Sequence, residues 1–167
     1  MTIVWRADGK DALVADLPGE VATFELGGLL AGVLRPGLVV YLKGELGAGK
    51  TTLVRGCLRA LGYQGRVKSP TFALVELYRI SSLYLHHFDF YRFNDPHEWI
   101  DAGLRDAFRG DNVCLVEWPE KAGRLLGAAD LQVTLESVDP GRRARLSADT
   151  ELGKQCLAQL TAGFRDS

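Results

Sequence analysis

One short segment of the chain combines the residue types that bind phosphate groups. It reads Gly-Glu-Leu-Gly-Ala-Gly-Lys-Thr over residues 44–51 and fits the pattern G-x4-G-K-S/T. Its glycines permit positive φ angles, so successive backbone N–H groups can converge on phosphate oxygens. We predict that Lys50 neutralises the outer phosphates of a nucleotide and that the Thr51 hydroxyl is a ligand of Mg²⁺. The candidate nucleotide-binding residues are Glu45, Leu46, Gly47, Ala48, Gly49, Lys50, Thr51 and Thr52.

An acidic residue, Glu117, ends the apolar run at residues 113–116. An acid in this position can hold Mg²⁺ through a water molecule or polarise the water that attacks a γ-phosphate. A strand-end acid can also be merely solvated, but a phosphate loop in the same chain favours a functional role. We therefore place Thr51 and Glu117 at a metal ion.

Asp89 is a second candidate acid, in the run His-His-Phe-Asp-Phe-Tyr-Arg over residues 86–92. A lone acid among aromatic residues can instead pair with Arg92, which could itself stabilise charge at the γ-phosphate or do neither. The mechanism we expect is attack of water on the γ-phosphate near Asp89 and Glu117, with Lys50 as the third catalytic residue.

These residues need a strand before the loop and a helix after it. Residues 38–42 form a continuous apolar run, typical of a strand covered on both faces, and residues 50–61 have helical spacing of apolar residues. The other expected elements are a helix that begins within 16–20 and ends before 35–37, an antiparallel pair of strands over 71–80 and 83–91, a helical region over 94–108, a strand over 113–116, a short helix over 119–126, a hairpin of strands over 131–138 and 143–147, and a last helix over 151–160. The order predicts an α/β fold: a three-layer P-loop NTPase-type sheet flanked by helices, with antiparallel hairpin additions.

The composition is that of an ordinary globular protein. The 167 residues include 20 basic and 21 acidic side chains, for a net charge of −1, and 47% are hydrophobic. This length and composition predict one domain over residues 1–167 and disfavour intrinsic disorder. The near-neutral charge argues against a dominant nucleic-acid-binding function. Glycine, at 19 of 167 residues, exceeds its usual share of about 7%, which indicates special turns or close backbone contacts.

Several classes of protein are disfavoured. The first residues do not form a secretory signal, and the longest apolar stretch, residues 27–34, is far shorter than the ~20 residues that span a bilayer. We expect a cytoplasmic protein without a membrane partner. Its three cysteines have no metal-site spacing, which favours buried or half-buried thiols. His86 and His87 are adjacent on an expected strand and so point to opposite faces; no metal bound only by protein ligands is predicted.

Four blocks of sequence together resemble one protein family. They are the phosphate loop with the residues after it at 44–56, Ser-Pro-Thr-Phe-Ala-Leu-Val at 69–75, His-Phe-Asp-Phe-Tyr-Arg at 87–92 and Leu-Val-Glu-Trp-Pro-Glu at 115–120. In this order and spacing, the chain closely resembles the TsaE family, formerly YjeE, over about residues 17–148. The phosphate loop alone is not specific to a family, whereas the other three blocks together are.

The resemblance implies an ADP-binding and weakly ATP-hydrolysing bacterial protein. Its family supports synthesis of N6-threonylcarbamoyladenosine in tRNA, beside the anticodon, for tRNAs that read codons beginning with A. The implied partners are TsaD, which transfers the threonylcarbamoyl group, and TsaB, a companion subunit. The chain would therefore act with TsaD-like and TsaB-like proteins, reach tRNA through that complex, and not perform the transfer itself.

The resemblance also implies roles for individual residues. Lys50 would hold phosphate, Thr51 and Glu117 would lie at Mg²⁺, and Asp89 would belong to the catalytic or switch region. Residues 69–71 would form a loop that responds to nucleotide. Further nucleotide contacts are implied near Glu20, Glu120 and Arg142. For Trp118, two roles are equally open: packing against other side chains, or contact with the nucleotide.

Two other classes of phosphate-loop protein remain as alternatives. A small-metabolite kinase needs a mobile lid with arginines; the segment 103–111 carries Arg105 and Arg109 but does not read as a clear lid. A signalling GTPase needs an Asn-Lys-x-Asp base-reading motif, which the sequence lacks. The acid-free segment 46–75 carries five basic residues, which could face phosphates, tRNA or an acidic partner, or form a solvated helix face.

Overall fold

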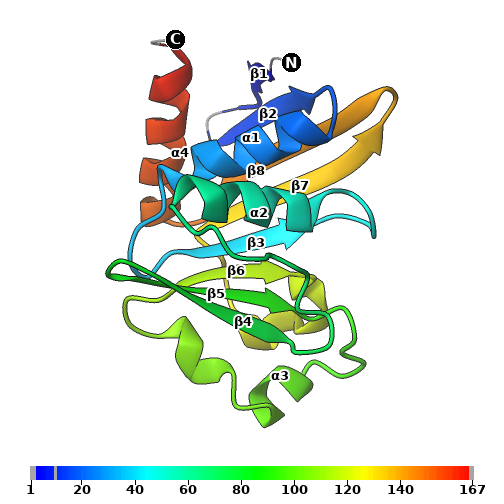
Figure 1. Ribbon diagram of the computed structural model, residues 1–167, viewed down its shortest axis with the longest axis vertical. Coiled ribbons are helices and arrows are strands. Elements are labelled where there is room, and N and C mark those ends of the chain that lie inside the picture. The colour runs from blue at the N-terminus through cyan, green and yellow to red at the C-terminus, as the bar shows by residue number, and fades with distance from the viewer. Residues whose placement is uncertain (1–2, 10, 166–167) are drawn as a thin grey trace.

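The structure, a computed structural model, describes residues 3–9 and 11–165, with side chains described up to residue 163. Eight strands form one sheet in the order β1-β2-β8-β7-β3-β6-β5-β4 (Figure 1). The strands are β1 Val4–Ala7, β2 Ala12–Leu17, β3 Val39–Lys43, β4 Val75–Ile80, β5 Leu83–Asp89, β6 Val113–Glu117, β7 Leu131–Val138 and β8 Gly141–Ala148.

The centre of the sheet is parallel and its edges are antiparallel. Strands β7, β3, β6 and β5 run in the same direction, whereas β4 at one edge and β8, β2 and β1 at the other pair antiparallel to their neighbours. Parallel neighbours end at the same edge of a sheet, and in open α/β sheets ligands bind outside these carboxyl ends. The loop after β3, Asp89 at the end of β5 and Glu117 at the end of β6 therefore meet at one edge.

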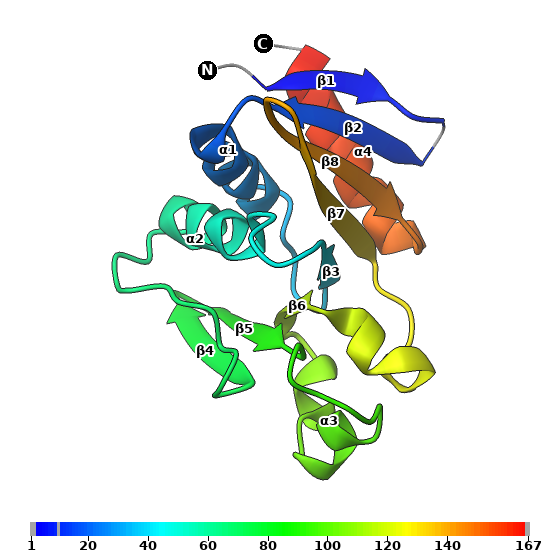
Figure 2. The same ribbon diagram turned by 90° about the vertical axis from the view of Figure 1, so that its right-hand side faces the viewer.

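Helices lie on both faces of the sheet (Figure 2). The long helices α1 and α2 cover one face, while α3 and the short 3-10 helices η1 to η3 lie on the other. Helix α4 lies at the end of the sheet opposite to the loop after β3 (Figure 1). The helices are α1 Glu20–Ala31, α2 Lys50–Ala60, α3 Glu98–Asp101, η1 Arg105–Phe108, η2 Pro119–Lys121, η3 Gly123–Leu126 and α4 Glu151–Arg165. The expected α/β fold with a flanked sheet is confirmed.

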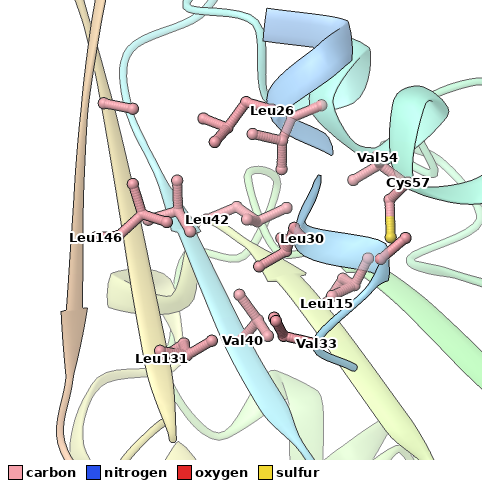
Figure 3. Close-up of a cluster of buried hydrophobic side chains, with 14 of the residues drawn as sticks. Leu26, Leu30, Val33, Val40, Leu42, Val54, Cys57, Leu115, Leu131 and Leu146 are labelled. Atoms are coloured by element: carbon pink, nitrogen blue, oxygen red, sulfur yellow. The ribbon is translucent and has the colours of Figure 1, made fainter. Parts of the chain in front are cut away.

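Burial on both faces explains the continuous apolar runs of the central strands. Along β3, Val40 and Leu42 pack into the cluster beneath α1 and α2 (Figure 3), whereas Tyr41 between them packs with the aromatic cluster on the other face. Strand β6 alternates in the same way, with Leu115 toward the helices and Val116 toward the aromatic cluster. Full burial of such a side chain contributes roughly 1.5–3 kcal/mol, so these strands fix the edge on which the loop sits.

Two glycines bring the backbones of α1 and α2 into direct contact. A β-carbon added to Gly27 would lie 2.0 Å from the carbonyl oxygen of Leu53, and one added to Gly56 would lie 2.0 Å from that of Phe24. Each glycine thus faces the backbone of the partner helix. Part of the glycine surplus is explained by this close approach, which holds α2 against α1.

Replacing Gly27 or Gly56 by alanine should destabilise the protein, although alanine favours a helix by about 1 kcal/mol over glycine. Overpacking against backbone atoms typically costs about 1–3 kcal/mol, which exceeds that gain. The matched control is Gly28→Ala, because its added β-carbon would meet nothing closer than the Ala60 side chain at 3.7 Å. Urea unfolding should show lower stability for the first two variants and unchanged or higher stability for the third. Equal stability of all three would contradict the close helix contact.

Three expected elements are broken by local turns. Residues 71–74 form a turn before β4, because Leu74 adopts φ 71° and its N–H donates to the carbonyl of Pro70 at 2.7 Å. The helical region over 94–108 is split into α3 and η1 at Gly103, which has φ 76°. The helix over 119–126 is two 3-10 turns, separated near Gly123 with φ 57°. These three predictions were wrong in their extent.

The first strands were not predicted at all. Strand β2 pairs with β8, whose residues are more than a hundred positions away in sequence, and β1 pairs with β2. The predicted helix near residues 20–34 ends earlier, at Ala31. The last helix extends five residues beyond its predicted end at 160.

The cysteine and membrane predictions can be compared with the described residues. Cys57, Cys114 and Cys156 are all buried free thiols, as expected, and burial raises the pKa of Cys57 and Cys114 to about 12. Among the helices of the described chain, none is long and apolar enough to cross a membrane.

Candidate functional site

The phosphate loop connects the buried strand β3 to the helix α2. Gly44, Gly47 and Gly49 have φ angles of 149°, 79° and 110°, values that side chains with a β-carbon rarely adopt. Helix α2 begins at Lys50, so the unpaired N–H groups and the positive end of its first turn face the loop. This is the arrangement of backbone donors that binds a phosphate group.

A cavity of about 360 Å³ opens above this loop. It brings together most of the residues predicted from the sequence, drawn from the loop, from the ends of β5 and β6 and from the segment 69–71. Its lining residues are Leu46, Gly47, Ala48, Gly49, Lys50, Thr51, Thr52, Ser69, Thr71, Asp89, Tyr91, Glu117 and Trp118. Strands β5 and β6 pair in the register that sets Asp89 beside Glu117.

Lys50 is buried at the floor of this site. Its ammonium group donates to the carbonyl oxygens of Gly44 and Glu45, the latter at 3.2 Å, and lies 4.2 Å from the centre of the Trp118 ring. Burial lowers the pKa of Lys50, and the nearby carboxylates, Glu117 first among them, oppose that shift. A desolvated cation interacts more strongly with an anion than an exposed one, which suits Lys50 to a phosphate.

Glu117 is held from two sides. It is 3% exposed, and its Oε2 accepts hydrogen bonds from the Thr51 hydroxyl at 3.3 Å and from the His87 ring at 2.6 Å. A hydroxyl and a carboxylate are the oxygen ligands that Mg²⁺ prefers, so these residues fit the predicted metal. Within the described residues, no group of three or more His, Cys, Asp or Glu could hold a metal. A Mg²⁺ ion here would need oxygens of a nucleotide and of water as well.

Asp89 anchors the segment that precedes β4. Its Oδ2 accepts hydrogen bonds from the hydroxyls of Ser69 at 2.7 Å and Thr71 at 3.0 Å, and its Oδ1 accepts one from the Tyr91 N–H at 2.9 Å. The side chain is buried, so these three donors satisfy it. Asp89 therefore joins the end of β5 to the segment 69–71.

The alternative that Asp89 pairs with Arg92 is not realised. No ion pair between them is found among the described residues, and the Arg92 guanidinium instead lies 3.9 Å from the centre of the Phe72 ring. Phe72 is 81% exposed.

Glu20 and Arg142 line a neighbouring cavity of about 290 Å³, which shares Gly47, Gly49 and Thr52 with the first. Arg142 donates from Nε to the carbonyl of Ala48 at 3.0 Å and from Nη2 to that of Gly47 at 3.2 Å. It therefore binds the loop backbone itself, while the Thr52 hydroxyl donates to Glu20 at 3.5 Å. Glu20 and Arg142 are adjacent to the site but do not line the cavity that holds Lys50.

Glu45 and Glu120 face a third cavity of about 510 Å³, which they share with Trp118. Trp118 follows Glu117 in a left-handed conformation, with φ 58°, and its ring packs 5.0 Å from that of Tyr91. The side chain thus packs against an aromatic partner and also lines the cavity around Lys50, so both roles left open by the sequence are compatible with its position.

Sequence reasoning missed His87 as a site residue. Its strand neighbours alternate, with Phe88 in the aromatic cluster on one face and His87 and Asp89 on the other. The signal available was its spacing of two from Asp89 on one strand face.

The two arginines considered for a kinase lid lie away from the cavity. Arg105 is 5.9 Å from the Trp99 ring centre and Arg109 pairs with Asp106 at 3.8 Å. Ala107 lies between the two arginines, and its carbonyl oxygen accepts hydrogen bonds from Asn112 and Cys114, which are just before and at the start of β6. Glu117 is at the opposite end of that strand. Neither arginine lines the cavities beside the loop.

Comparison with known proteins places the chain in one family. The model of the family described as "Threonylcarbamoyl adenosine biosynthesis protein TsaE" matches residues 17–145. A protein of Haemophilus influenzae named "tRNA threonylcarbamoyladenosine biosynthesis protein TsaE" is 42% identical over 153 residues, which cover 89% of this chain and 97% of that protein. A protein of the same name from Bacillus subtilis is 40% identical over 115 residues, covering 69% and 72% of the two chains.

The solved structures include one of similar shape. The crystal structure of Bacillus subtilis YdiB superposes with a TM-score of 0.75 and 27% identity, covering 98% of each chain. With a family model that spans residues 17–145 and a relative that is 42% identical over 89% of the chain, this chain belongs to the TsaE family.

Proposed function

We propose that the chain is a Mg²⁺-dependent ATPase that serves as an accessory subunit in the synthesis of N6-threonylcarbamoyladenosine in tRNA. The main support for ATPase activity is that the phosphate loop, Thr51, Asp89 and Glu117 all line one cavity. The process is supported by the names of its relatives, which refer to threonylcarbamoyladenosine biosynthesis. ATP or ADP and Mg²⁺ would be its ligands.

Each residue of the cavity has a role in this proposal. Lys50 and the loop N–H groups bind the β- and γ-phosphates, while Thr51 and Glu117 hold the metal. Mg²⁺, when bound, neutralises charge on the phosphate oxygens and orients them. The oxygen of a water molecule forms a bond to the γ-phosphorus as the bond to the ADP oxygen breaks, and Asp89 or Glu117 orients that water and accepts its proton.

The chain is expected to be a slow ATPase by itself. Both carboxylate oxygens of Asp89 already accept hydrogen bonds, from the hydroxyls of Ser69 and Thr71 and from the Tyr91 N–H. While these bonds persist, Asp89 is not available to orient the attacking water or to accept its proton. A partner that draws the segment 69–71 away would release it. We propose TsaD-like and TsaB-like proteins as these partners, with tRNA reached through the complex and the threonylcarbamoyl transfer left to the TsaD-like subunit.

A labelling experiment tests the proposed activity. ATP radiolabelled in its γ-phosphate is incubated with the chain, with Mg²⁺, and with or without the TsaD-like and TsaB-like proteins of the same organism. Thin-layer chromatography should show slow release of inorganic phosphate to water, and the partners should raise that rate. Threonylcarbamoyladenosine in added tRNA, measured by mass spectrometry of its nucleosides, should depend on this chain.

Other outcomes would contradict either the proposed reaction or the proposed accessory role. Transfer of the label to a small metabolite would make the chain a kinase. Phosphate release that the partners leave unchanged, together with tRNA modification that proceeds without the chain, would remove the accessory role. A pull-down with and without ATP, followed by mass spectrometry, identifies the partners directly.

A further inference from the structure

His87 is a fully buried polar side chain that neither phosphate binding nor water attack uses. It is 0% exposed, lies two residues before the end of β5, and its ring reaches the Glu117 side chain at the end of β6. A polar ring buried at this depth loses its contacts with water and must recover them within the protein. Its one hydrogen-bond partner among the described residues is Glu117.

The role proposed for Glu117 sets the direction of this hydrogen bond, because a carboxylate that serves a metal ion is ionised. The Nε2 atom of His87 lies 2.6 Å from Oε2 of Glu117. An ionised carboxylate only accepts, so Nε2 carries the proton of this bond. The other ring nitrogen, Nδ1, is buried and has no partner among the described residues, so the bond to Glu117 is the polar contact that orients the ring.

This bond fixes one oxygen of Glu117 and leaves the other free. Oε2 accepts a hydrogen bond from His87 on β5 and another from the Thr51 hydroxyl on α2, so two different elements hold the same oxygen. No hydrogen bond to Oε1 is found within the described part of the chain. Both the position of the carboxylate and the oxygen it presents to the cavity are therefore set by neighbouring side chains.

We propose that His87 is a positioning residue for the metal acid: it holds Oε2 of Glu117 beside Thr51, so that Oε1 would be available to a bound metal or its water. The inference rests on the proposed Mg²⁺-nucleotide site. Without a fixed partner, a glutamate side chain must lose rotamer freedom when it engages the metal, which weakens binding. Residues that orient a metal ligand in this way typically change metal affinity 10–100-fold when they are replaced.

The test measures metal binding without turnover. Mn²⁺ replaces Mg²⁺ as the probe, the non-hydrolysable analogue AMP-PNP replaces ATP, and electron paramagnetic resonance reports free Mn²⁺. His87→Met keeps a side chain of similar size and removes the donor, so it should raise the half-saturating Mn²⁺ concentration about 10–100-fold. His87→Gln retains an N–H donor and should restore much of the affinity.

Two controls separate positioning from a general effect on the fold. His86 is adjacent, half-buried and on the opposite strand face, stacked 6.0 Å from Phe88, so His86→Met makes the same change without touching Glu117 and should leave Mn²⁺ binding unchanged. In a Glu117→Gln background, adding His87→Met should cause little further loss, because the two residues act through one hydrogen bond. Thermal unfolding verifies that each variant is folded.

The results that overturn the proposal differ from those that overturn the function. If His87→Met binds Mn²⁺ as tightly as the parent chain, or if its effect is undiminished in the Glu117→Gln background, His87 does not position Glu117. If His87→Gln binds Mn²⁺ as weakly as His87→Met although both variants are folded, the N–H donor is not what sets the metal affinity and the proposal fails. If the parent chain binds no Mn²⁺ with AMP-PNP, the proposed nucleotide site itself is wrong and this inference fails with it.

Discussion

Replacing Lys50 by alanine should abolish measurable binding of Mg-ATP. The ammonium group is buried beside the loop, and its loss removes both a charge and hydrogen bonds from the place where phosphates are expected. Truncation of one partner in a buried charge pair typically costs about 2–5 kcal/mol, which corresponds to a rise in dissociation constant of roughly 30-fold to several thousand-fold. Isothermal titration calorimetry with ATP and Mg²⁺ measures this change directly.

The matched control for this variant is Arg55→Ala. Arg55 belongs to the same helix, α2, is half-buried and does not line the cavity around Lys50, so its loss should leave ATP affinity near that of the parent chain. Circular dichroism verifies that both variants are folded. Normal ATP binding by Lys50→Ala would show that the nucleotide site has been assigned to the wrong place.

Replacing Glu117 by glutamine should separate binding from turnover. The amide has the same size and its oxygen can still accept from His87, so the buried end of β6 should keep its packing. It cannot carry the negative charge that holds the metal or accepts a proton, and removal of such a group typically lowers the rate about 10²–10⁴-fold. We expect ATP to bind without Mg²⁺ almost as before, and Mg²⁺-stimulated phosphate release to be lost.

A glutamate far from the loop provides the comparison for this change. Glu151 begins α4, which lies at the opposite end of the sheet, and Glu151→Gln removes the same charge there (Figure 1). Its phosphate release should match that of the parent chain at every Mg²⁺ concentration. Unchanged turnover in Glu117→Gln would exclude this residue from the metal and from the reaction.

The loop and the strands around it could be predicted because their information is local. The glycines, Lys50 and Thr51 are consecutive, and the apolar runs that precede the loop and Glu117 require burial on both faces wherever they occur. The parallel pairing that places Asp89 beside Glu117 follows from the order of strands and helices. The sequence therefore predicts directly which functional side chains meet at one edge of the sheet.

The remaining features depend on contacts between distant segments. Strand β2 has a regular apolar pattern, but its partner β8 is separated from it by most of the chain, so no short window indicates the pairing. His87 was recognisable as buried on one strand face, yet its role depends on the Glu117 side chain across a strand boundary. The turn at residues 71–74 is stabilised by Leu74 accepting a hydrogen bond from the N–H of Asp89, which local propensity does not encode.

The close approach of α1 and α2 at Gly27 and Gly56 has a mechanical consequence for the cavity. One wall is formed by α2, whose backbone rests on that of α1 with no side chain between them, so it cannot shift without separating two helices. The facing wall, residues 69–71, is attached to Asp89 by two hydroxyl hydrogen bonds, each worth about 0.5–3 kcal/mol. A ligand that fills the cavity therefore contacts a rigid wall at α2 and a more easily moved wall at residues 69–71. We therefore expect a ligand to displace the segment 69–71 rather than α2, and the exposed Phe72 follows that segment directly in the chain.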